Sequence, residues 1–313
     1  MVRAMFDFLA LAIMRQFVIC GTLDLTLANG SGHQLQGRSP GPHASITIHD
    51  RATFLRLVTK LNLQPGQSVL DIGCGWGGLA MAMTECRENL SVTGLTLSER
   101  QLAHARKTAA EHSLKDRLDF ALRDYRDQGG AFDRIVSVGM LEHVGPADVP
   151  AYFRTVKRLL APGGVAVIHS IAVHDRATPV NRWMTRYIFP GGHLPSLPQL
   201  VRAAEAGGPK ILDMEIMRGH YAETLLHWPM RFLRNRDRIT ALYDERFVRM
   251  WEFYLAGCEY FFRCQHGMVV QPQLSDDHQA VPESRDYITE LETEFRDRLC
   301  RNDHSGKKRA SAT

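Results

Sequence analysis

The sequence predicts an α/β protein in which helices cover both faces of a parallel sheet, with a small α+β domain before it. Two observations support this. Short apolar segments alternate with helical ones from residue 68 onward, and a glycine-rich turn at residues 73–77 directly follows the first of them. Such alternation is typical of parallel strands joined by crossover helices. With 313 residues, 44% hydrophobic and 23% charged, the composition is that of an ordinary globular protein.

Residues 1–58 are expected to form the small amino-terminal domain. An apolar run at residues 8–14 is too short to span a bilayer, so an amphipathic helix packed on its own domain is preferred over an interfacial membrane anchor. Alternating apolar and polar residues at 17–27 and 44–49 then predict an antiparallel meander. Helical spacing at 51–61 follows.

The alternating part, residues 59–292, is the predicted main domain. Its expected elements in order are strand 68–72, helix 78–85, strand 90–95, helix 98–112, strands 118–122 and 134–138, helix 149–160, strand 165–171, helix 197–206 and strand 210–216. A helical, aromatic insertion is expected around 178–265, followed by a last strand at 268–274. Residues 293–313 are expected to be a flexible tail, disordered from Asn302.

The glycine-rich turn carries the first functional signal. Asp71 ends the strand, and Gly73, Cys74, Gly75 and Gly77 follow it. Glycine lets the backbone turn sharply and lets a ligand approach the main chain. The Asp-x-Gly-x-Gly-x-Gly spacing differs from the Gly-x-Gly-x-x-Gly fingerprint of dinucleotide sites. It favours S-adenosylmethionine, whose ammonium group Asp71 can accommodate. The alternative is a turn that needs glycine only for packing.

Ligands of open parallel sheets bind beyond the carboxyl ends of the strands, where the strand order reverses. The residues after the later strands are therefore further candidates. They are Thr96, Leu97 and Gln101 after the second strand, Asp124 and Tyr125 after the third, Gly139, Glu142 and His143 after the fourth, and His169 and Ile171 in the fifth. Thr96 stands where an acidic residue often binds ribose, so main-chain groups and Gln101 are expected to replace it.

Composition and charge exclude some other classes. The six cysteines form no Cys-x-x-Cys pair, so neither a metal site nor a disulfide framework is predicted, and a reducing cytosol fits best. A net charge of +4 allows an anionic membrane surface without requiring one. The basic residues are spread along the chain and no nucleic-acid methyltransferase motif occurs, so no nucleic-acid partner is expected.

Four segments resemble cyclopropane-fatty-acyl-phospholipid synthases. They are residues 69–78 (VLDIGCGWGG), 92–101 (VTGLTLSERQ), 132–145 (FDRIVSVGMLEHVG) and 187–196 (YIFPGGHLPS). The resemblance covers roughly residues 60–290, and the amino-terminal meander also looks like the front domain of that family. It implies a Rossmann-like class I methyltransferase sheet and binding of S-adenosylmethionine through the glycine-rich turn and the residues at the next two strand ends.

The resemblance also implies a reaction and its catalytic residues. The sulfonium methyl adds to the cis double bond of an unsaturated phospholipid, and a bound bicarbonate removes a proton as the cyclopropane ring closes. Glu142, His169, the backbone at Ile171 and Tyr221 would hold that bicarbonate. Taken singly, Glu142 could instead cap the next segment, His169 could be a core histidine, and Tyr221 an ordinary half-buried aromatic.

The same resemblance implies where the protein acts. The partner would be unsaturated phospholipid in a bilayer, met by peripheral association from the cytoplasmic side, and a homodimer is one oligomeric state compatible with it. Aromatic residues of the 178–265 insertion would line an acyl tunnel, with ordinary core packing as the alternative. These residues are Trp183, Tyr187, Phe189, Trp228, Trp251 and Tyr254.

One segment of the family is missing. A His-Tyr-Asp-type motif normally lies between the front domain and the glycine-loop strand, whereas here residues 57–59 run directly into residues 60–63. The donor site would then be open to solvent on one side, which weakens the exclusion of water. Two alternatives therefore stay open: a lipid C-methyltransferase that forms a methyl-branched acyl chain, and a truncated, non-catalytic binding homologue.

Overall fold

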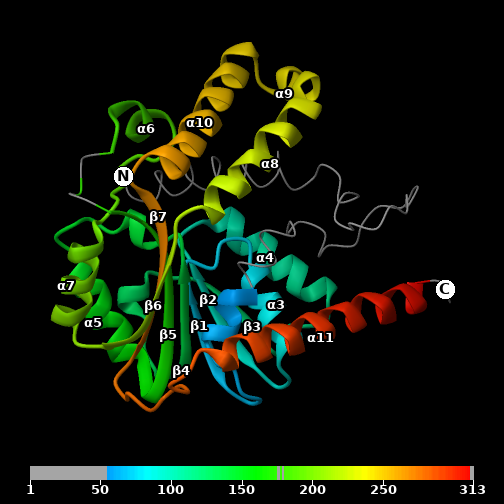
Figure 1. Cartoon of the computed structure of the whole chain (residues 1–313). Coiled ribbons are helices and arrows are strands. Elements are labelled where there is room, and N and C mark those ends of the chain that lie inside the picture. Colours follow the sequence, from blue (N-terminus) through cyan, green and yellow to red (C-terminus); the bar gives the residue numbers. More distant parts are fainter. Residues whose placement is uncertain (1–54, 175–176, 178–179, 311–313) are drawn as a thin grey trace.

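The computed structural model describes residues 55–174, 177 and 180–310 (Figure 1). The expected amino-terminal meander lies outside these residues. Residues 55–60 are helical and lead through a turn into the first strand of a seven-stranded sheet. The strands are β1 Ser68–Ile72, β2 Ser91–Thr96, β3 Leu118–Leu122, β4 Phe132–Val138, β5 Leu160–Val173, β6 Lys210–Met217 and β7 Gly267–Ser275.

The sheet is mixed rather than parallel throughout. Its order is β3-β2-β1-β4-β5-β7-β6, and the first five strands pair in parallel as predicted. The expected Rossmann-like sheet is confirmed, and the one strand that departs from parallel pairing is β7, which lies between β5 and β6 and runs antiparallel to both. A period-2 pattern identifies a strand but carries no information about its direction, so the sequence could not reveal this.

Helices cover both faces, as predicted. The helices are α3 Gly78–Cys86, α4 Glu99–Glu111, α5 Val149–Leu159, α6 Arg182–Tyr187, α7 Leu197–Gly207, α8 His220–Arg234, α9 Arg236–Leu242, α10 Glu245–Cys264 and α11 Asp286–Ala310, with 3-10 turns η2 Tyr125–Asp127 and η3 Leu141–His143. Successive side chains of a strand point to opposite faces. Val69 therefore packs with α3, α4 and α11, whereas Leu70 packs with α5 and α7.

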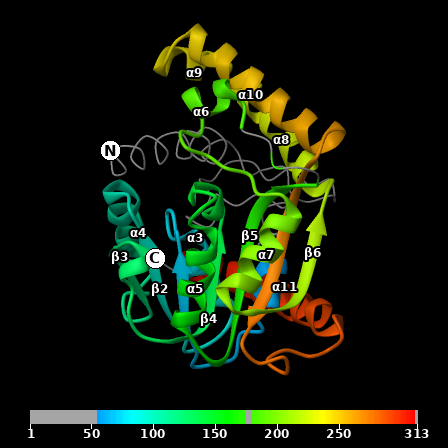
Figure 2. The same ribbon diagram turned by 90° about the vertical axis from the view of Figure 1, so that its left-hand side faces the viewer.

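The helical insertion forms a separate aromatic cluster. Helices α8, α9 and α10 lie together at the end of the sheet where β6 leads into α8 (Figure 2). Trp228, Trp251 and Tyr254 are buried in this cluster, which favours core packing for these three over the acyl-tunnel interpretation. Trp183, Tyr187 and Phe189 pack against the cluster and are only partly buried.

Residues 286–310 form helix α11, whereas a flexible tail was expected from residue 293. Helix α11 extends to Ala310, and Phe295 and Leu299 on it are buried against the α3 side of the sheet. The guanidinium of Arg87 lies 4.5 Å from the centroid of the Phe295 ring. Apolar residues recur every three to four positions in this segment, which gives the helix one apolar face. The segment is also strongly charged, so its composition alone suggested a flexible tail.

Candidate functional site

The predicted site lies where the strand order reverses. The chain moves outward from β1 to β2 and β3 on one side, and from β4 to β5 on the other. The loops after β1 and β4 therefore flank the reversal and touch each other. A Cβ placed on Gly73 would lie 3.2 Å from Cγ of Met140. This contact confirms that residues about 70 positions apart in sequence meet at one edge.

The three glycines of the loop have different roles. Gly73, Gly75 and Gly77 all have positive φ. A Cβ on Gly77 would come within 2.8 Å of the Phe120 ring, so packing requires glycine at this position, whereas a Cβ on Gly73 would press on the Met140 side chain at 3.2 Å. Gly75, with φ of 55°, faces open space, since no atom of the described residues lies within 4 Å of its would-be Cβ. Gly75 alone leaves room for a ligand against the backbone.

Asp71 is a buried carboxylate beside this open backbone. It is 1% exposed, and its Oδ2 has no hydrogen-bond partner within the described part of the chain. Burial raises the pKa of Asp71 to about 7. The neighbouring Cys74 thiol is also buried, and desolvation together with the nearby Asp71 charge raises its pKa. A buried carboxylate with an unused oxygen is suited to a cationic ligand.

The residues after β2 are bound to one another. The Thr96 hydroxyl donates to Oε1 of Gln101 at 2.7 Å and accepts the Ser98 N–H at 3.1 Å. Ser98 in turn caps α4 by accepting from the Gln101 N–H. Thr96 is 5% exposed, while Leu97 is partly exposed. Thr96 therefore positions the Gln101 side chain, whose amide NH₂ can donate hydrogen bonds.

The residues after β3 form a charged turn. Both carboxylate oxygens of Asp124 accept from the Arg126 guanidinium, at 2.9 and 2.6 Å. These bonds lower the pKa of Asp124. The ring of Tyr125 meets Tyr152 edge to face, with 5.4 Å between centroids. The Asp124 carboxylate is thus held in the turn by its own neighbour, a contact that the sequence reading did not include.

Glu142 and the β5 backbone are joined directly. Oε1 of Glu142 accepts the backbone N–H of Ile171 at 2.6 Å, and the Glu142 carbonyl accepts from the His193 N–H at 2.9 Å. The Glu142 Oε2 atom is buried and has no partner among the described residues. Burial raises the pKa of Glu142 to about 6, despite the Ile171 bond that lowers it. The N–H of Ile171 therefore holds Glu142, whereas the resemblance implied a bond from this backbone to the anion.

His169 is held in one tautomer by a chain of side chains. Lys60 Nζ donates to Oε1 of Gln271 at 2.9 Å, and Nε2 of Gln271 lies 2.9 Å from Nδ1 of His169. An ammonium only donates, which fixes the orientation of the amide, and an amide NH₂ only donates, so Nδ1 accepts. Burial lowers the pKa of His169 to about 4. The ring is therefore neutral, with its proton on Nε2.

The far end of this chain of side chains is an ion pair between the buried Lys60 and the partly exposed Glu215. Lys60 is fully buried and lies 2.5 Å from Oε2 of Glu215, which Arg56 also contacts at 2.9 Å. Burial would raise the pKa of Glu215, but the bonds from Arg56 and Lys60 outweigh it and bring the pKa to about 2. Sequence reasoning missed Lys60 and Gln271. The available signal was a glutamine within the apolar strand β7.

Tyr221 is placed by the helical cluster. Its ring meets Phe262 at 4.8 Å and Trp228 at 6.1 Å between centroids. Tyr221 and Ile171 both pack against the same cluster. No group of three or more His, Cys, Asp or Glu suited to a metal occurs among the described residues.

Known proteins resemble this chain in sequence. The mycolic acid cyclopropane synthetase family matches residues 43–272. A cyclopropane-fatty-acyl-phospholipid synthase of Escherichia coli is 41% identical over 69% of this chain and 55% of its own length. A tuberculostearic acid methyltransferase of Mycobacterium tuberculosis is 39% identical over 70% of this chain and 52% of its own. The chain thus spans about half the length of these relatives.

A solved structure shows the same arrangement. The mycolic acid cyclopropane synthase CmaA1, complexed with SAH and CTAB, superposes with a TM-score of 0.72 at 29% identity. The superposition covers 87% of this chain and 97% of that one. The comparison therefore supports the strand order and the position of the loops at its reversal.

Proposed function

The chain belongs to the mycolic acid cyclopropane synthetase family, and we propose that it transfers a methyl group from S-adenosylmethionine to the cis double bond of an unsaturated phospholipid, forming a cyclopropane ring. The proposal depends on one observation: two groups of suitable residues lie on either side of the point where the strand order reverses. On one side, the buried Asp71, whose Oδ2 has no partner among the described residues, precedes the open backbone at Gly75 by four positions. On the other side, Glu142 accepts the N–H of Ile171 in β5, two positions along the strand from His169, whose ring Gln271 orients.

The residues after β1 fit the donor. Asp71 would accept from the ammonium of the donor's methionine part, and Gly75 would let its chain lie against the main chain. Gln101 would present its amide to the nucleoside. S-adenosylmethionine supplies an electrophilic methyl when bound. The structural neighbour CmaA1 is complexed with SAH, which supports a donor of this class.

The residues after β4 and in β5 would hold the base. An alkene is a weak nucleophile, so the site must orient it, exclude water and receive a proton. We propose bicarbonate as that base. The Nε2–H of His169 and the Tyr221 hydroxyl would donate to it, and Oε2 of Glu142 would accept its hydroxyl. Ile171 would act indirectly, since its N–H orients Glu142.

The place of action is part of the proposal. We propose peripheral association with a phospholipid bilayer from its cytoplasmic side, supported by the names of the lipid-modifying relatives and the net charge of +4. Among the described helices, none combines the length and the apolarity that a bilayer crossing needs. A homodimer is compatible with this proposal, and light scattering of the purified chain tests it. The proposal includes no nucleic-acid partner.

One experiment tests the reaction. The purified chain is incubated with labelled S-adenosylmethionine and vesicles of unsaturated phospholipid, with and without bicarbonate, and the lipid product is identified by mass spectrometry and NMR. A cyclopropane acyl chain whose formation requires bicarbonate is the expected result. A methyl-branched chain would instead identify a lipid C-methyltransferase. Absence of label in the lipid would identify a non-catalytic homologue.

A further inference from the structure

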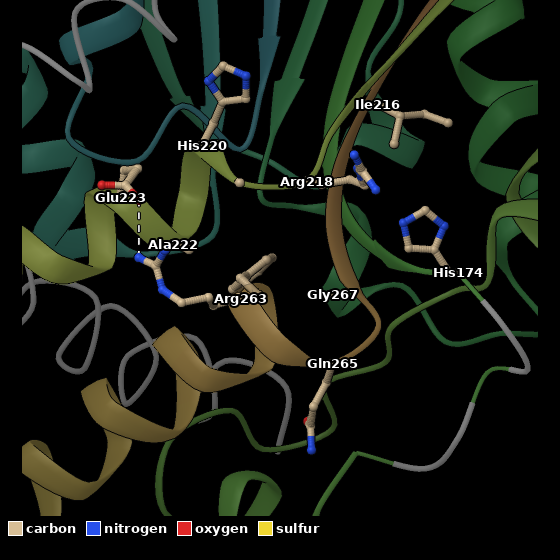
Figure 3. A pocket seen from close by; sticks show the side chains of 11 residues that line it. His174, Ile216, Arg218, His220, Ala222, Glu223, Arg263, Gln265 and Gly267 are labelled. Atoms are coloured by element: carbon tan, nitrogen blue, oxygen red, sulfur yellow. Dashed lines mark hydrogen bonds and ion pairs between the residues drawn. The ribbon is translucent and has the colours of Figure 1, made fainter.

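A cavity of about 730 Å³ lies where β6 leads into α8, apart from the residues predicted for the site. Its lining comes from three regions far apart in sequence: the end of β5, the β6–α8 junction, and the α10–β7 junction. Figure 3 shows Arg218 and His174 on one side, and Arg263 with Glu223 on another. Its volume is within the range of small-molecule sites.

The charged residues that line this cavity are two arginines and one glutamate. Arg263 is neutralised, because its guanidinium contacts Glu223 at 3.1 Å and also bonds Glu259. Arg218 has no ion-pair partner among the described residues, and it is exposed at the cavity. His174 and His220 add imidazole nitrogens that can donate hydrogen bonds. A guanidinium with adjacent imidazoles is suited to a phosphate oxygen.

The cavity also has an apolar wall next to the proposed catalytic region. Phe262 and Ala222 line it and are buried, while Ile216 lines it with 42% of its surface exposed. The Phe262 ring also contacts the Tyr221 ring, with 4.8 Å between the two centroids. Phe262 therefore lines the cavity and also contacts Tyr221, the residue proposed to hold the base. An anionic group in the cavity would be one aromatic ring away from Tyr221.

We propose that this cavity binds the phosphodiester of the phospholipid substrate, with Arg218 as the main contact and the Phe262 wall directing an acyl chain toward Tyr221. The inference rests on the proposed function, since that function supplies a substrate with an anionic head and an apolar tail. Phosphate from a lipid and free phosphate share the same recognition chemistry. The two sources are separated below by testing them individually.

The test measures binding without the methyl donor. Dihexanoylphosphatidylglycerol is titrated into the full-length chain by calorimetry, alongside dihexanoylglycerol, which lacks the phosphate, and inorganic phosphate. Arg218→Gln is expected to weaken binding of the phosphatidylglycerol about tenfold or more, the effect of losing a charged hydrogen bond. Affinity for dihexanoylglycerol should stay unchanged. Arg218→Lys should retain part of the affinity.

Arg154→Gln is the matched control, because Arg154 is an exposed arginine on α5 outside the cavity lining. It should bind all three ligands as the unmodified chain does. Unchanged phosphatidylglycerol binding in Arg218→Gln, or an equal loss for both lipids, would overturn the proposal. Inorganic phosphate that binds as tightly as the lipid would identify a free-phosphate site and would also overturn it. Because no donor is present, failure of methyl transfer leaves this readout unaffected.

Discussion

Nε2 of Gln271 lies 2.9 Å from Nδ1 of His169, linking β7 to β5 inside the sheet. Both side chains are buried, with Gln271 at 0% and His169 at 8% exposure. The Lys60 ammonium at the other end of the amide sets its direction. A residue outside the predicted set therefore decides which nitrogen of His169 carries the proton, and Gln271 is a positioning residue.

Replacing Gln271 by leucine tests this role. The substitution removes the donor to Nδ1, so the His169 ring should populate both neutral tautomers. Turnover should then fall about tenfold or more, which is the usual effect of losing the partner that orients a functional histidine. Donor affinity should stay unchanged. ¹⁵N NMR of His169 reports the tautomer. Gln273→Leu is the control. Gln273 lies on the same strand as Gln271, but it donates to the Lys60 carbonyl and to the Tyr287 hydroxyl instead of to His169. An unchanged His169 spectrum in Gln271→Leu would refute the role.

Glu142→Gln separates the base site from the donor site. The amide still accepts from the Ile171 N–H but can no longer act as a carboxylate toward the proposed bicarbonate hydroxyl. Turnover should fall by about a hundredfold, within the usual range for general acid–base groups. Calorimetry should show nearly the same affinity for S-adenosylmethionine. If affinity and turnover fell together, Glu142 would belong to the donor pocket.

Gly75→Val should abolish donor binding while the chain still folds. The side chain fills the open space at the loop, and φ of 55° adds strain of about 1–2 kcal/mol to the folded state. Gly66→Val is the matched control, because Gly66 also has positive φ and an open surrounding among the described residues but lies before β1. It should lose similar stability by urea unfolding and keep its affinity. Full affinity in Gly75→Val would remove the loop from the donor site.

Donor binding should depend on pH through Asp71. Burial raises its pKa to about 7, so below pH 7 the free protein holds a neutral carboxyl that must lose its proton before it can pair with an ammonium. Affinity should therefore fall about fivefold from pH 7 to pH 6, a range in which an α-amino group stays charged. Calorimetry in two buffers should detect proton release on binding. Asp71→Asn should bind weakly at both pH values, and a pH-independent affinity in the unmodified chain would contradict the assignment.

Phe295→Ala tests whether α11 is part of the folded core. The ring is fully buried beside Leu299 and under Arg87. Its truncation should lower the free energy of unfolding by about 3–5 kcal/mol, measured with urea. Arg296→Ala, at an exposed position on the same helix, should change it by less than about 0.5 kcal/mol. A small effect of Phe295→Ala would restore the flexible-tail expectation.

Local patterns were sufficient for much of the fold. Strands β1 and β3 match the expected limits, and the other expected elements of the main domain agree within a few residues except at β5. The strand β5 begins at Leu160, five residues before the expected start, because Leu160 already pairs with Phe132 of β4; residues 161–164 then form an irregularity before pairing resumes between Val165 and Arg134. Glycine and proline indicate a break in a helix, but they do not reveal which neighbouring strand the chain then meets.

The sequence by itself determined the order of elements, the glycine loop after β1 and the edge at which the candidate residues meet, because periodicity and backbone freedom are local properties. Tertiary structure alone decided the direction of β7, the packing of α11, the bond from Ile171 to Glu142, and the chain from Lys60 through Gln271 to His169. Lys60 and Gln271 lie 211 positions apart. Pairing of buried polar groups over such separations depends on which strands become neighbours, and no local pattern encodes that choice.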